Sequence, residues 1–177
     1  MEITTAHLVL REFQMSDFEA VWAYQSLPES NYYENGVPSQ EDVRDILKHA
    51  VLQALAMPRI HYNLALTIRP DDIPRGTIKL HLQYEESREW EVGWAVDPAC
   101  WGQGYATEAA RGVLDYAFKE LNAHRVVAFC KTLNVASWRV MEKLGMQREG
   151  RLREDRLWNG AWSDAFIYSI LDREWAL

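Results

Sequence analysis

The sequence of 177 residues lacks any apolar run that approaches the roughly 20 residues needed to cross a membrane as a helix. Its amino-terminal stretch also lacks the basic segment and following apolar segment of a signal peptide. Cysteine is scarce, because only Cys100 and Cys130 are present, and two residues do not make a disulfide framework. These absences argue against a membrane or secreted protein and predict a cytoplasmic protein with reduced thiols.

Basic residues are in the minority, with 19 Lys and Arg against 26 Asp and Glu and a formal net charge of −7. A nucleic-acid-binding surface is therefore not expected, because contacts to phosphates require clustered Lys and Arg. The five histidines lie far apart without the spacing of metal ligands, so we predict no metal site. Carboxylate-rich clefts concentrate amines, so the acidic balance favours a cationic partner, although it could serve solubility alone.

Neither an internal repeat nor a low-complexity linker interrupts the sequence, so we predict one domain over residues 1–177. Apolar periodicity and turn signals predict seven strands, over residues 3–13, 61–68, 76–84, 89–96, 124–131, 147–157 and 165–171. Four helices are predicted, over residues 16–27, 39–57, 105–121 and 134–144. A capping box pairs Ser16 with Glu19, and Ser39 has Asp42 three residues on. This order predicts an α+β fold, in which a mixed sheet carries helices on both faces.

A glycine-rich turn, Trp101 to Ala106 (WGQGYA), separates a predicted strand from a predicted helix. Gly102 and Gly104 allow the backbone to approach a ligand closely, and the free N–H groups of a helix start bind phosphate oxygens. The same spacing also fits a turn without a ligand. A dinucleotide-binding fold would need a third glycine in an early parallel frame, and a P-loop would need Gly-Lys-Ser/Thr; both are lacking.

Three segments together resemble the GNAT acetyltransferase superfamily, namely residues 91–98 (EVGWAVDP), 101–109 (WGQGYATEA) and 134–137 (NVAS) followed by 142–146 (EKLGM). The chain is most similar to the branch that contains the ribosomal-protein N-terminal acetyltransferases, over nearly its whole length and in order. The resemblance implies a GNAT-like fold, with a central mixed, mostly antiparallel sheet of seven strands flanked by about four helices. It also implies an acetyl-CoA-dependent N-acetyltransferase, a monomer or homodimer, that acts on a primary amine by direct attack in a ternary complex.

The resemblance further implies that coenzyme A binds at the glycine turn, with its pyrophosphate on the backbone N–H groups of residues 102–107. The pantetheine arm would lie along residues 94–96, like an added strand. Lys131, Arg139 and Lys143 are candidates for contact with the 3′-phosphate, with surface solvation as the alternative. The residues that this resemblance makes candidates for coenzyme contact are Trp94, Ala95, Val96, Trp101, Gly102, Gln103, Gly104, Tyr105, Ala106, Thr107, Asn134, Ser137 and Lys143. Among these, Trp101 stands where the family has Gln or Arg.

Glu91 is our first choice for the general base, because Gly93 and Ala95 share its face of the predicted strand and leave space beside it. A carboxylate there could draw a proton from the amine through a water molecule. An exposed strand charge is the alternative interpretation, and Glu89, on the same face, is the nearest rival. Backbone N–H groups near Ala95 and Val96 are the candidates for stabilising the oxyanion.

The proton donor for the leaving thiolate is an open question. Many members of the superfamily have a Tyr seven residues after the Asn that corresponds to Asn134, and this chain has Met141, which cannot donate a proton. Asn134 suits a helix N-cap and would also contact the pantetheine amides. Ser137 could take the role of acid, or the thiolate could leave unassisted, since a thiol pKa lies near about 8.5. A non-catalytic acyl-CoA sensor is the alternative that Met141 leaves open.

The acceptor amine is expected to enter opposite the coenzyme, between the loop of residues 31–38 and the final hairpin. The candidate pocket walls are Tyr32, Tyr33, Glu91, Trp158 and Trp162. The resemblance suggests a protein N-terminus, but the superfamily also acetylates aminoglycosides, polyamines and other small amines. The sequence does not choose among these acceptors.

Overall fold

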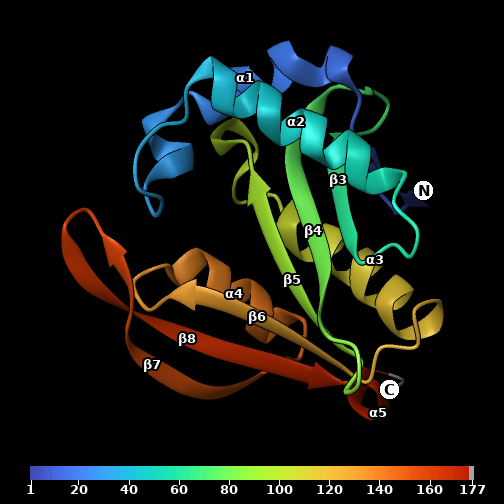
Figure 1. Cartoon of the computed structure of the whole chain (residues 1–177), viewed down its shortest axis with the longest axis vertical. Helices are drawn as coiled ribbons and strands as arrows, with labels where there is room; N and C mark the ends of the chain where they lie inside the picture. The colour runs from blue at the N-terminus through green and yellow to red at the C-terminus, as the bar shows by residue number, and fades with distance from the viewer. Residues whose placement is uncertain (176–177) are drawn as a thin grey trace.

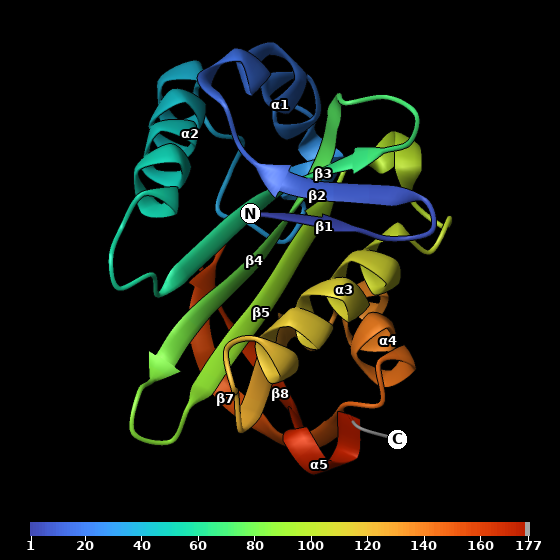
Figure 2. The same cartoon turned by 90° about the vertical axis from the view of Figure 1, so that its right-hand side faces the viewer.

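Eight strands form one mixed sheet in the computed structural model, which describes residues 1–175 (Figure 1, Figure 2). The order across the sheet is β1-β2-β3-β4-β5-β6-β8-β7. The strands are β1 (Glu2–Thr4), β2 (Leu8–Glu12), β3 (His61–Ile68), β4 (Pro74–Tyr84), β5 (Glu89–Val96), β6 (Arg125–Lys131), β7 (Gln147–Trp158) and β8 (Ala161–Leu171). The helices are α1 (Phe18–Gln25), α2 (Gln40–Ala54), α3 (Tyr105–Lys119), α4 (Val135–Lys143) and the short α5 (Asp172–Trp175). Within the described residues only β5 and β6 pair in parallel, which confirms the predicted mixed, mostly antiparallel sheet.

The first predicted strand, residues 3–13, is a hairpin of β1 and β2, so the sheet has eight strands rather than seven. Thr5 turns the chain, because its N–H donates to Leu8 O at 2.9 Å and its hydroxyl accepts from the Leu8 N–H at 3.1 Å. Glu108, in α3, accepts hydrogen bonds from the Thr5 hydroxyl (2.6 Å) and the His7 N–H (2.7 Å). The break in the strand therefore depends on a carboxylate 103 residues from Thr5, beyond the reach of local periodicity.

The start of α1 also differs from the prediction, because the capping box joins Gln14 and Asp17 rather than Ser16 and Glu19. This box opens a short 3-10 helix, η1 (Met15–Asp17), which leads into α1. Arg11 explains the difference, since two of its guanidinium N–H groups donate to the buried Asp17 carboxylate at 2.9 Å each. At α2 the predicted start is confirmed: the Ser39 side chain accepts from the N–H three residues on, as in a capping box.

Helices α1 and α2 cover one face of the sheet, and α3 and α4 cover the other (Figure 2). The side chains buried under α1 and α2 are Phe13, Val21, Tyr24, Val43, Leu47, Ala50 and Ala65. On the opposite face, α3 buries a stripe of small and branched residues, Ala109, Ala110, Val113, Leu114 and Ala117, against the larger core. Among residues 1–175, no helix is both long and apolar enough to cross a membrane.

The sheet opens between β5 and β6. Their parallel ladder has three residue pairs and ends where Glu91 meets Val127. Beyond this point β5 continues beside β4 and β6 continues beside β8, so the two halves of the sheet diverge (Figure 1). Backbone groups on the facing edges of the two strands are left without a strand partner there, and this gap is where the candidate site lies.

Gly76 supports the end of β5 by close approach. A Cβ at this position of β4 would lie 2.5 Å from the backbone oxygen of Ala95. We expect Gly76→Ala to lower the free energy of unfolding by about 1–3 kcal/mol, because backbone must shift to relieve the overlap. Thermal unfolding measures this loss. Gly93→Ala is the matched control, since a Cβ there meets no atom within 4 Å; equal stability losses in the two variants would contradict this explanation.

Candidate active site

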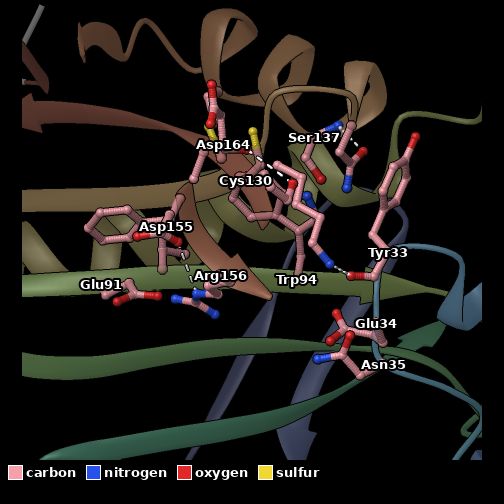
Figure 3. A pocket seen from close by; sticks show the side chains of 18 of the residues that line it. Tyr33, Glu34, Asn35, Glu91, Trp94, Cys130, Ser137, Asp155, Arg156 and Asp164 are labelled. Carbon is pink, nitrogen blue, oxygen red and sulfur yellow. Dashed lines mark hydrogen bonds and ion pairs between the residues drawn. The ribbon is translucent and has the colours of Figure 1, made fainter. Parts of the chain in front are cut away.

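A cavity lies in the gap between the diverging ends of β5 and β6 (Figure 3). β5 contributes Glu91 and Trp94 to its wall, and α4 contributes Ser137 and Met141. The β7–β8 hairpin closes another side with Arg156, and the loop before α2 closes the end near β6. The structure therefore brings together residues from four separate parts of the chain.

Glu91 faces this cavity with a side chain that is 25% exposed. Burial raises the pKa of its carboxyl, and the nearby positive charge of Arg156 opposes that increase. The Gln83 side-chain amide donates to Glu91 Oε2 at 2.6 Å, whereas Oε1 has no hydrogen-bond partner among residues 1–175. One oxygen is thus held in place and the other is available to a water molecule or an amine.

Glu89, the rival carboxylate, has a different environment. It accepts a hydrogen bond from Arg125 Nε at 2.7 Å and does not line the cavity. The same guanidinium also binds Glu149 across the sheet. Glu89 therefore belongs to an ion-pair cluster beside the β5–β6 ladder, and of the two carboxylates Glu91 is the one available for chemistry in the cavity.

A histidine and a glutamine on β4 lie next to Glu91 and were not singled out in the sequence. His81 is the cross-strand partner of Glu91, and its Nε2 lies 3.5 Å from Glu91 Oε2. Burial, together with the positive charges of His61 and Lys79, lowers the pKa of His81, which favours its neutral form at neutral pH. Strand register could have identified His81, but the place of Gln83 follows a register shift after Leu82.

The opposite wall of the cavity is the start of α4. The side chain of Asn134 accepts a hydrogen bond from the Ser137 N–H at 3.1 Å, as an N-cap does. The Ser137 hydroxyl has no hydrogen-bond partner within residues 1–175 and faces the cavity with Met141. Met141 is 1% exposed and offers no acidic proton.

The glycine turn has the backbone that an anion cradle needs. Gly102 and Gly104 have φ values of +77° and +87°, and Gly104 is the N-cap of α3. Both conformations favour glycine, and no atom lies within 4 Å of a Cβ built at either position. The N–H groups of residues 102–107, which include Gln103 and the first α3 residues Tyr105, Ala106 and Thr107, find no hydrogen-bond partner in the described part of the chain. They are therefore free to bind a phosphate.

Trp101 connects this turn to β5, because its indole Nε1 donates to Val96 O at 2.7 Å. The hydrogen-bonding direction alternates along a strand, and Asp97 N–H donates to Arg75 O, towards β4. By this alternation Ala95 also points its backbone groups to β4, whereas Trp94 and Val96 point theirs into the gap. Of the two oxyanion candidates, only Val96 therefore directs its N–H towards the cavity side.

Lys131 and Lys143, two of the basic residues predicted to contact the 3′-phosphate, lie in different places. Lys131 lines the cavity instead of the surface, donates to the backbone oxygen of Tyr33, and lies 4.7 Å from the centre of the Trp158 ring. Lys143 lies in the last turn of α4, exposed and outside the cavity lining. The structure thus directs Lys131 towards the loop before α2 and leaves Lys143 on the outer surface.

An aromatic cluster closes the cavity beside the loop before α2. Tyr32, Tyr33 and Trp158 pack with ring centres 4.9–6.1 Å apart. The Tyr33 hydroxyl donates to Leu133 O at 3.0 Å, and the Trp158 indole donates to Glu34 O at 3.1 Å. The loop is therefore tied both to the β6–α4 connection and to the hairpin. Tyr33 lines the cavity itself, whereas Tyr32 and Trp158 line a second hollow beside it.

Trp162 does not line either hollow, contrary to the prediction, and its side chain is 63% exposed. β8 begins at Ala161, four residues earlier than predicted, and the residues of this strand that line the cavity are Ser163, Asp164 and Ala165.

Cys130 lines the cavity and was not assigned a role from the sequence. Burial raises the pKa of its thiol to about 11, so it stays protonated at neutral pH. Burial likewise raises the pKa of Cys100, beside the glycine turn. Neither thiol has the environment of an activated nucleophile.

Comparisons with known proteins bear on this site. Residues 7–147 match the family model described as acetyltransferase (GNAT) domain. A Bacillus subtilis protein named "Uncharacterized N-acetyltransferase YnaD" is 37% identical over 99% of this chain and 99% of its own length. The crystal structure of an acetyltransferase (GNAT family) from Bacillus anthracis superposes with a TM-score of 0.86, at 34% identity, over 98% of this chain and all of that one. The Bacillus subtilis "Putative ribosomal N-acetyltransferase YdaF" is 36% identical over 56% of this chain and 55% of its own.

Proposed function

Because this chain belongs to the acetyltransferase (GNAT) family and is an N-acetyltransferase, we propose that it moves an acetyl group from acetyl-CoA to the α-amine of a peptide. The observation that carries the proposal is the placement of Glu91, a partly buried carboxylate with one free oxygen, on the wall of the cavity where β5 and β6 diverge. The name of YdaF, which refers to a ribosomal N-acetyltransferase, favours a protein amine as acceptor.

The glycine turn suits the coenzyme end of such a site. Its free N–H groups and the positive end of the α3 dipole would hold the pyrophosphate, even though the whole protein is acidic. The outward backbone groups of Trp94 would pair with the pantetheine arm, while Asn134 and Ser137 face it from the other wall. Acetyl-CoA supplies an acetyl group activated as a thioester.

Glu91 would accept the proton of the attacking amine. The amine nitrogen bonds to the acetyl carbon while the carbon–sulfur bond breaks, and the sulfur leaves with the electron pair. The released proton passes through water to the free Oε1 of Glu91 and then to solvent, which the 25% exposed side chain can reach. The Val96 N–H, directed into the gap, would stabilise the oxyanion that forms on the way.

Departure of the thiolate does not require Met141. The Ser137 hydroxyl faces the cavity without a partner in the described residues and would donate to the sulfur directly or through water. A thiol pKa of about 8.5 also allows the thiolate to leave without a donor.

Thiol release with a panel of acceptors tests the proposed activity. The protein and acetyl-CoA are mixed with one acceptor at a time, namely a peptide amide, spermidine or an aminoglycoside, and the release of free thiol is followed. We expect release with the peptide amide, at a rate that depends on its concentration. Tight binding of acetyl-CoA without thiol release from any acceptor would instead indicate an acyl-CoA sensor.

A further inference from the structure

The β7 strand contains a β-bulge opposite Asp164. The pairing register shifts between Leu152 and Arg156, so that residues 153–155 of β7 lie opposite Asp164 alone on β8. Glu154, within this bulge, has a φ of +53°. The Asp164 carboxylate holds the bulge, because it accepts from the Glu154 N–H at 2.8 Å and from the Arg151 side chain. Bulges of this kind re-aim side chains and are common beside active sites.

The bulge places Asp155 and Arg156 on the cavity wall, facing Glu91 (Figure 3). The Arg156 side chain is 72% exposed, and its Nε donates to Asp155 Oδ2 at 3.1 Å, while its two terminal nitrogens have no hydrogen-bond partner among residues 1–175. Arg156 and Glu91 do not form an ion pair in the described structure, although the positive charge is near enough to lower the pKa of Glu91. A carboxylate and a guanidinium therefore face each other with space between them.

We propose that Arg156 is a specificity-determining residue that binds the carbonyl oxygen next to the acceptor amine, an inference that rests on the proposed acetyl transfer. With the amine at Glu91, a guanidinium with free N–H groups would recognise a hydrogen-bond acceptor close to the amine. The carbonyl group bonded to the amine-bearing carbon is such an acceptor. A polyamine lacks this oxygen and would place a second cation near the guanidinium. Three other carboxylates, those of Glu34, Asp155 and Asp164, line the same cavity and disfavour an acceptor with a free carboxylate. The site therefore suits a peptide amine, whose carbonyl is neutral.

The test compares two amines that differ by one group. Phenylalaninamide carries a carboxamide beside its amine, and 2-phenylethylamine has the same ring and amine without it. We expect Arg156→Gln to lower kcat/KM for phenylalaninamide about 10-fold or more, because a hydrogen bond to a charged group is lost. The same substitution should change kcat/KM for 2-phenylethylamine by less than about 3-fold. Arg153→Gln is the matched control, since it removes the same charge from the same bulge outside the cavity lining.

Each outcome has a separate meaning. Dividing the loss for one amine by the loss for the other cancels any effect of Arg156 on the pKa of Glu91, because both amines need the same base. Equal losses for both amines, or equal losses in the Arg156 and Arg153 variants, would overturn the role of Arg156 and leave the proposed activity standing. If the wild-type protein acetylated neither of the two amines, both the role of Arg156 and the proposed activity would be overturned. Faster turnover of phenylalanine than of phenylalaninamide would contradict the preference for a neutral carbonyl.

Discussion

Glu91→Gln is expected to lower kcat at saturating amine by about 10²- to 10⁴-fold, the range typical of a lost general base. Glutamine keeps the size of the side chain and its hydrogen bond from Gln83, but it cannot accept the proton of the amine. Steady-state thiol release at saturating acetyl-CoA and amine measures the change. Glu89→Gln is the matched comparison, because Glu89 lies two residues away and binds Arg125 outside the cavity.

The pH dependence of kcat follows from the same residue. A protonated Glu91 cannot act as a base, so kcat should rise with pH through the pKa of this carboxyl. Burial raises that pKa above its ordinary value of 4.5, so the acid limb of the profile should lie at a higher pH than for an exposed glutamate. Glu91→Gln should remove this limb, and Glu89→Gln should retain it. An unchanged rate and profile in the Glu91 variant would show that another group accepts the proton.

Gly104→Glu is expected to weaken acetyl-CoA binding on the order of 100-fold or more, because it brings a negative charge to the N–H groups that would hold the pyrophosphate. The left-handed conformation of Gly104, with φ of +87°, adds a strain of roughly 1–2 kcal/mol for any other residue. Calorimetric titration with acetyl-CoA measures the affinity, and thermal unfolding shows that the variant is folded.

Gly160→Glu separates the charge from the strain. Gly160 has a similar φ of +79° and open space around its Cα, but it lies in the turn between β7 and β8. The two variants should lose comparable stability, while only the Gly104 variant should lose affinity for acetyl-CoA. Comparable affinities in the two variants would place the pyrophosphate away from the glycine turn.

Much of the fold could be predicted from local patterns. The start of α2 was predictable because Ser39 and Asp42 form their capping contacts within one turn of chain. The class of the sheet was predictable because strand-like segments and turn residues alternate in a recognisable order. These features depend on residues that are close in sequence, where spacing alone carries the information.

The errors arise where tertiary contacts, rather than the spacing within one segment, decide the local structure. Glu108 splits the first strand, and Arg11 draws Asp17 into a different helix start. In the candidate site, Glu91 could be proposed from its strand and its neighbours, but Arg156 could not, because its direction depends on the bulge that Asp164 holds. Lys131 resembles a surface cation in the sequence, and only the fold places it against Tyr33 and Trp158.

The most direct test of acetyl transfer to an α-amine uses one peptide in two forms. Both forms contain an internal lysine, and one has a free amino terminus while the other has a blocked one. With acetyl-CoA and the wild-type protein, we expect one thiol to be released for each free-terminus peptide acetylated at its α-amine, and no release with the blocked peptide. Equal thiol release with both forms, or acetylation at the lysine alone, would contradict the proposed function.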